Sequence, residues 1–183
     1  MKGGVKSGGS GKDPKSPGRR ARDTIIVLLS AAAILAVSSM VFFPVIKVTG
    51  TNMEPTLQDG DVLITFRQGS FNRGDIAAFY YNNKILLKRV IALEGDEVTV
   101  REDGAVFVNG SQLEDPYISE PSLGENDLTY PYTVPEGKIF TLGDHRATSI
   151  DSRSNAIGSV SSEFIVGKIV FRIWPLDKIG PVS

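Results

Sequence analysis

Apolar residues form one long run near the N-terminus and many short runs after it. Residues 24–46, TIIVLLSAAAILAVSSMVFFPVI, contain no charged side chain. At about 1.5 Å rise per residue, a helix of this length covers a hydrocarbon core of about 30 Å. The pattern therefore predicts a single transmembrane anchor over residues 24–46.

Two other structures can contain a long apolar run, namely a buried core helix and a cleaved signal peptide. A core helix of a soluble domain has a polar stripe, and here only scattered Ser interrupts the run. The apolar part of a signal peptide is usually about 7–15 residues, which is shorter than this run. A retained anchor is the better explanation.

The periodicity changes beyond residue 46. Short runs rich in β-branched and aromatic residues alternate with turn sequences, and no window has the stripe of an amphipathic helix. This predicts a mainly β fold, an antiparallel β-sheet domain over residues 47–183, with residues 97–132 as a candidate small insertion. The β-rich runs are VIKVTG, DVLITF, DIAAFYY, KILLKRVIAL, EVTV, AVFVNG, KIFTLG and FIVGKIVFRIW.

Charge orients the predicted anchor. Residues 1–23 are rich in Gly, Ser, Pro and Lys, and they contain seven Lys/Arg against two Asp. They are expected to form a disordered basic tail that stays in the cytoplasm, with residues 47–183 outside the cell membrane. The outer part has 13 Lys/Arg and 19 Asp/Glu, which argues against a nucleic-acid partner.

Two side chains are candidates for a catalytic base. His145 is the chain's one histidine, and a Ser–His–Asp triad can be drawn from it with Asp144 or Asp151. Lys88 lies within an apolar run, where alternation sends it and Arg89 to opposite faces of a strand, so that one of them is more buried. If Lys88 is the buried one, its amine is favoured in the neutral form and can act as a base near pH 7. The alternative is that Lys88 lies on an edge strand, where its charge only limits aggregation.

Four segments together resemble the bacterial type I signal peptidases, which are membrane-anchored serine endopeptidases with a Ser–Lys dyad. A fifth, weaker element is the C-terminal strand with its Trp-Pro, residues 167–180. The segments occur in the family's order behind one N-terminal anchor. They are GTNMEPTL (50–57, family G-x-S-M-x-P-T-L), RGDI (73–76), KRVI ending in GD (88–96) and GDHRATSIDSR (143–153, family G-D-N-R-x-x-S-x-D-S-R).

The resemblance implies roles at the matching positions. Lys88 falls on the general base, and Ser149 falls on the serine that orients it. Asp151 and Arg153 fall on a salt-bridging pair that braces the site. Met53 and Pro55 fall on two further bracing positions, on the turn that shapes the nucleophile segment. His145 falls where the family has Asn.

The nucleophile position holds Asn52 instead of serine. Its amide nitrogen is delocalised into the carbonyl, so it has no proton that Lys88 could remove to make a useful nucleophile. The backbone N–H of residue 52 can still serve as an oxyanion donor. Thr51 has a hydroxyl but would point to the opposite face of an extended strand. A water activated by Lys88 would leave nearly silent activity.

Two functions follow from the resemblance. The first is recognition of the signal peptides of exported precursor proteins and, in an active form, their cleavage at Ala-x-Ala-type sites at the cell membrane. The second is an inactive homologue that binds secreted or surface proteins and assists their assembly. A β domain with structural motifs only is a third option. The expected partners are signal peptides and membrane lipid, and no cofactor or metal is expected.

Overall fold

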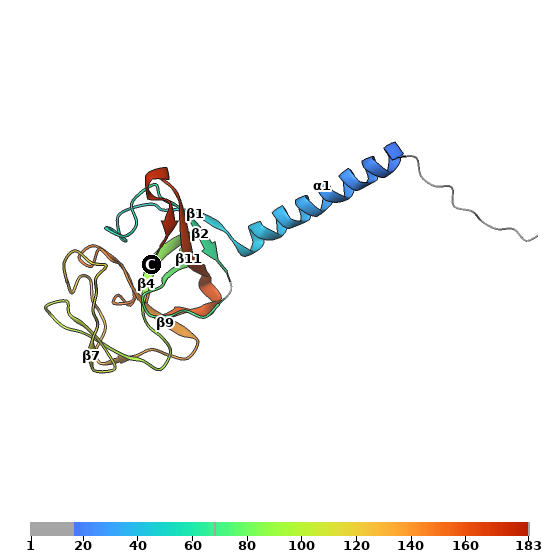
Figure 1. Cartoon of the computed structure of the whole chain (residues 1–183). Helices are drawn as coiled ribbons and strands as arrows, with labels where there is room; N and C mark the ends of the chain where they lie inside the picture. The colour runs from blue at the N-terminus through green and yellow to red at the C-terminus, as the bar shows by residue number, and fades with distance from the viewer. Residues whose placement is uncertain (1–16, 68, 183) are drawn as a thin grey trace, which may run out of the picture. The chain divides into compact units, whose positions relative to one another are not determined.

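The computed structural model describes residues 17–67 and 69–182 in two compact units, one ending at Ser39 and one beginning at Met40. The first unit contains helix α1 (Pro17–Phe42) up to Ser39 (Figure 1). Residues 17–23 therefore belong to this helix rather than to the predicted disordered tail. The remainder of that tail, residues 1–16, lies outside the described residues.

Helix α1 is long and apolar enough, over Ala21–Ser39, to cross a membrane. It ends at Phe42, four residues before the end of the predicted anchor. The residue before a proline avoids helical geometry, and Pro44 follows directly after Phe43. The backbone oxygens of Phe42 and Pro44 then accept N–H groups from Arg67 and Thr65. These residues thus lead into the sheet.

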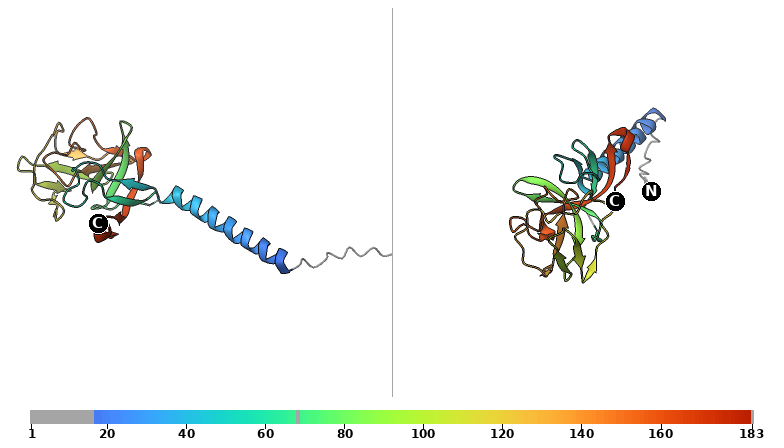
Figure 2. Two further views of the ribbon diagram at one scale, coloured as in Figure 1. Left: turned by 90° about the horizontal axis from the view of Figure 1, so that it is seen from above. Right: turned by 90° about the vertical axis from the view of Figure 1, so that its left-hand side faces the viewer.

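Residues 45–181 are mainly antiparallel β-sheet, as the alternation of apolar runs predicts (Figure 1 and Figure 2). In the described residues, the large sheet has the order β1-β2-β11-β3-β4-β9-β10, with β12 paired to β11. Its strands are β1 (Val45–Lys47), β2 (Val62–Phe66), β3 (Ile76–Tyr81), β4 (Lys84–Ala92), β9 (Lys138–Leu142), β10 (Val160–Ser161), β11 (Ile165–Trp174) and β12 (Gly180–Pro181).

The second sheet has the order β7-β6-β5-β8 and lies within residues 97–133, the range that includes the candidate insertion. Valines of β5 and β6 pack against Phe140 and Leu142 of the large sheet, so the two sheets share a hydrophobic core. Short 3-10 helices follow β10 and β11. The elements are β5 (Glu97–Val100), β6 (Val106–Val108), β7 (Ser111–Gln112), β8 (Tyr132–Thr133), η1 (Ser162–Phe164) and η2 (Leu176–Lys178).

Strands β3 and β4 form a tight hairpin. Asn82 and Asn83 both have positive φ, at 46° and 61°, which matches the twist of a two-residue turn. Tyr81 therefore pairs with Lys84, and the register places Ala77 opposite Lys88. This hairpin fixes Lys88 near the middle of the large sheet.

Candidate active site

Lys88 and Ser149 form a buried pair. Both side chains are nearly inaccessible, at 0% and 1% exposure, and Lys88 Nζ donates a hydrogen bond of 2.5 Å to Ser149 Oγ. Burial lowers the pKa of Lys88 to about 8, because the charged ammonium loses its hydration, while the Asp151 carboxylate partly opposes this shift. A useful fraction of Lys88 is therefore neutral near pH 7–8.

The alternative of a lysine that blunts an exposed strand edge is wrong, because Lys88 is buried and its amine is bound to Ser149. Lys88 and Arg89 do have separate partners, as alternation predicts. Alternation predicts that only one of the two side chains is strongly buried. Both are, because Arg89 is also only 1% exposed. Its guanidinium is covered by the ring of Tyr117, 3.5 Å from the ring centroid.

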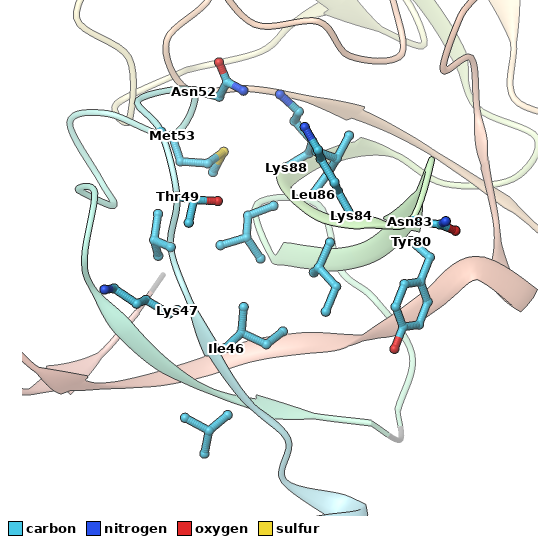
Figure 3. Close-up of a pocket in the computed structure, with 15 residues that line it drawn as sticks. Ile46, Lys47, Thr49, Asn52, Met53, Tyr80, Asn83, Lys84, Leu86 and Lys88 are labelled. Carbon is cyan, nitrogen blue, oxygen red and sulfur yellow. The ribbon is translucent and has the colours of Figure 1, made fainter.

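Asn52 lies on a turn that spans residues 51–57, not on the extended strand that its sequence suggests. The chain leaves β1 through Gly50, whose φ of +86° ends the extended geometry. Met53 and Leu57 anchor this turn in the core, and the Leu57 N–H donates to the Met53 oxygen at 2.8 Å. The carboxamide of Asn52 and the amine of Lys88 point toward each other (Figure 3).

Gly143 separates Ser149 from the backbone of Asn52. A Cβ atom at this position would lie 2.1 Å from Ser149 Oγ and 2.7 Å from the Asn52 oxygen. Only glycine therefore allows the approach of these two segments. The Asn52 oxygen also accepts the N–H of His145 at 3.1 Å, so the loop after β9 holds the turn directly.

We expect Gly143→Ala to reduce stability by about 1–3 kcal/mol, because overpacking forces backbone or side-chain shifts. The measurement is a urea midpoint of the full chain in detergent. Gly180→Ala is the matched control, because no atom lies within 4 Å of its added Cβ and its φ is not positive. Equal midpoints for the two variants would contradict the close packing around Gly143.

Asp151 and Arg153 form a bidentate ion pair next to Gly143 and Ser149. Arg153 Nε and Nη2 donate to Asp151 Oδ1 and Oδ2 at 2.8 and 2.9 Å, and both side chains are 0% exposed. Asp151 Oδ2 also accepts the Gly143 N–H at 3.0 Å. Arg153 further donates to the backbone oxygens of Ser122, Leu123 and Arg146. The pair thus ties three loops together around the site.

A second buried ion pair was not singled out as a site feature from the sequence. Arg89 binds Asp144 through two hydrogen bonds of 2.8 and 2.7 Å, and Arg89 Nη1 also donates to the Gly74 oxygen. Thr56 Oγ1 donates to the same Asp144 at 2.5 Å, which fixes the far end of the Asn52 turn. Both residues stand next to predicted site positions in the sequence, Asp144 after Gly143 and Arg89 after Lys88. Their spacing alone does not predict that they form a pair.

The competing nucleophile and base are less well placed. The Nδ1 atom of His145 is buried without a hydrogen-bond partner among the described residues, whereas a triad requires a bond from it to an acid. Thr51 is exposed, and the Thr56 hydroxyl is bound to Asp144. Pro55 is exposed on the same turn. Within the described residues, no cluster of three His, Cys, Asp or Glu is arranged to hold a metal ion.

A groove of about 670 Å³ ends at Asn52 and Lys88 (Figure 3). One wall is the segment from β1 to the turn, and the other is the first half of β4 with the hairpin tip. Ile46, Val48, Met53 and Leu87 make its floor largely apolar, because they also belong to the core. Lys88, whose amine is bound to Ser149, therefore lines the end of a groove that has room for a ligand.

Comparison with known proteins gives consistent matches. The family model for signal peptidase, peptidase S26, matches residues 21–174. Signal peptidase I of Bacillus caldolyticus is 37% identical over 82% of this chain and 90% of that protein. Signal peptidase I of Bacillus licheniformis is 32% identical over 84% of this chain and 88% of that protein. A solved signal peptidase I from Enterococcus faecalis V583 is 32% identical, with a TM-score of 0.44, and covers 55% of this chain and 97% of that one.

Proposed function

The chain belongs to the signal peptidase S26 family, and we propose that it recognises the signal peptides of exported precursor proteins. In its active form, with a serine at position 52, it cleaves them at Ala-x-Ala-type sites. The observation that supports this proposal most directly is the hydrogen-bonded Lys88–Ser149 pair facing position 52 at the end of a groove. In this proposal Lys88 is the general base and Ser149 orients it.

The strand edges beside the groove support binding of an extended peptide. Val48 exchanges hydrogen bonds with the segment before β2, so alternation turns the backbone groups of Lys47 away from β2 and toward the groove. Across the groove, Ile85 and Leu87 turn their backbone groups away from β3, and β9 pairs with β4 only from Arg89 onward. A peptide strand between these edges can bond to both walls.

The chemistry at position 52 follows from the neighbouring amine. A serine hydroxyl there would give its proton to neutral Lys88 and attack the scissile carbonyl. The C–N bond then breaks, the leaving amine takes the proton from Lys88, and water hydrolyses the acyl-enzyme. The backbone N–H of residue 52 is proposed to stabilise the oxyanion, since it needs no particular side chain. Asn52 lacks a hydroxyl, so the chain with asparagine is expected to be inactive or nearly so.

The membrane placement is also part of the proposal. Helix α1 provides the anchor, and the basic residues before it and in its first turns favour a cytoplasmic N-terminus. The β domain then lies outside the membrane, where the signal peptide of a translocated precursor ends. The proposed partners are therefore signal peptides and the lipid around the anchor, not nucleic acid.

A second candidate function rests on Asn52 itself. The groove needs no nucleophile to bind an extended peptide, so a chain with asparagine can hold a precursor without cutting it. Such a protein would act as a binding or assembly factor for secreted or surface proteins. It is distinguished from the first function by whether any precursor is cleaved by the chain as it stands.

The pH dependence of cleavage tests the role of Lys88. In the Asn52→Ser variant, kcat/KM for an Ala-x-Ala precursor should rise about tenfold per pH unit below pH 8 and level off above it. The reason is that the pKa of Lys88 is about 8, so about a tenth of the amine is neutral at pH 7 and about nine tenths at pH 9. A profile that is flat or falls over pH 6–9 would contradict a lysine base.

A further inference from the structure

The cations of the groove have no acidic counterpart. Among its lining residues are Lys47, Lys84 and Lys88, and none of the lining residues is Asp or Glu. The domain as a whole has the opposite balance, since residues 47–183 contain 19 acidic and 13 basic side chains. The groove is therefore a locally basic strip on an acidic domain.

Two of these lysines are free to meet a ligand. Lys47 and Lys84 are exposed, and neither has an ion pair or side-chain hydrogen bond within the part of the chain that the structure describes. Two lysines outside the groove are paired, Lys168 with Asp75 at 2.8 Å and Lys178 with Gln58 at 2.7 Å. Lys88 differs, because it is buried against Ser149.

The position of Lys84 along β4 sets where a peptide would meet it. Lys84, Leu86 and Lys88 alternate along the strand and so share one face. At about 3.3 Å per residue, Lys84 lies about 13 Å along the strand from Lys88. An extended peptide advances by the same amount over four residues. Lys84 points along the groove on the side of Lys88, while Lys47 points outward from the opposite wall (Figure 3).

We propose that Lys84 makes the groove selective for peptides that have an acidic side chain four residues from the residue bound next to Lys88. This rests on the proposed function and names the substrate class of the same groove. If the residue next to Lys88 is the one before the scissile bond, the favoured acidic residue is the fifth before that bond. Lys84 is then a specificity residue and takes no part in the bond cleavage.

The test measures binding of labelled peptides to the full chain in detergent by fluorescence anisotropy. Three peptides with the same Ala-x-Ala motif have Glu, Gln or Lys at the fifth position before the expected cut. We expect the Glu peptide to bind about two- to fivefold more tightly than the Gln peptide at low salt, as for exposed ion pairs, and this preference to fade at high salt. The Lys peptide should bind most weakly.

Variants separate a charge effect from a general loss of binding. Lys84→Gln should abolish the difference between the Glu and Gln peptides, and Lys84→Glu should reverse the order so that the Lys peptide binds best. A reversal cannot come from misfolding. Lys178→Gln, an exposed lysine outside the groove, should leave the preference unchanged.

The outcomes distinguish this inference from the proposed function. Equal binding of all three peptides, or a preference that persists in Lys84→Glu, overturns the selectivity while leaving signal-peptide recognition intact. Failure of every peptide to bind, together with no cleavage by Asn52→Ser, overturns both. Retention of the Glu preference in Lys84→Gln and its loss in Lys47→Gln would also overturn the assignment to Lys84.

Discussion

Asn52→Ser is expected to raise the rate of precursor cleavage by about 10³–10⁶-fold over the chain with asparagine. Losing the nucleophile of a serine protease costs on this order, while binding and the oxyanion hole leave a small residual rate. In this chain the carboxamide of Asn52 points toward an amine whose pKa is lowered to about 8. A hydroxyl at the same position would face a base that can already accept its proton.

The measurement is the initial rate of cleavage of a precursor with an Ala-x-Ala site, followed by mass spectrometry of both fragments. Asn52→Ser combined with Lys88→Met is the matched control, because methionine keeps the length of the side chain without an amine. Its activity should return to that of the chain with Asn52. Absence of cleavage by the serine variant would contradict an otherwise intact site. Cleavage by the Asn52 chain that survives Lys88→Ala would exclude the dyad.

Arg153→Met is expected to lower the free energy of unfolding by about 3–5 kcal/mol. Removing one partner of a buried ion pair leaves the other charge uncompensated, and Asp151 is 0% exposed. The carbonyls of Ser122 and Leu123 lose their donor in the same variant. Arg73→Met is the control, because its pair with Asp96 is 44% exposed on the arginine side and is worth less than about 1 kcal/mol.

Urea unfolding of the full chain in detergent, followed by circular dichroism, measures both variants. Asp151→Asn combined with Arg153→Met should recover part of the loss, because no buried charge then stands alone. Similar midpoints for Arg153→Met and Arg73→Met would show that the buried pair adds little to stability.

The strand content was predictable because apolar alternation reports burial directly. The run DVLITF forms β2, whose burial alternates along the strand. The run KILLKRVIAL forms β4, in which Leu87–Ala92 are buried on both faces. Two-residue strands such as β7 and β12 were missed, because so short a segment has no period. The extended geometry predicted at Thr51 and Asn52 is wrong, whereas the turn predicted at Met53 and Pro55 is present and begins already at Thr51.

The site was predictable where a motif places residues close in sequence, and not where folding brings distant ones together. Lys88 and Ser149 are 61 positions apart, and their local sequences do not indicate that they are in contact. The family resemblance alone predicts that Ser149 orients Lys88. The Arg89–Asp144 pair spans 55 positions, and nothing in either local sequence indicates the other. The sequence also does not show that Lys84 and Lys88 line the same groove. That depends on the register of β4, which only the structure gives.

The buried Asp151–Arg153 pair would be retained for stability even in a chain that does not cut, so its presence is not evidence of catalysis. Selection for a folded domain alone would keep both residues in a descendant that no longer cuts, because losing either one exposes the fold to an unpaired charge. Lys88 is different, since its lowered pKa means that its burial opposes folding at neutral pH. Replacing this lysine would therefore stabilise a chain that does not cut, so its retention is what the proposed descent from a cutting enzyme predicts.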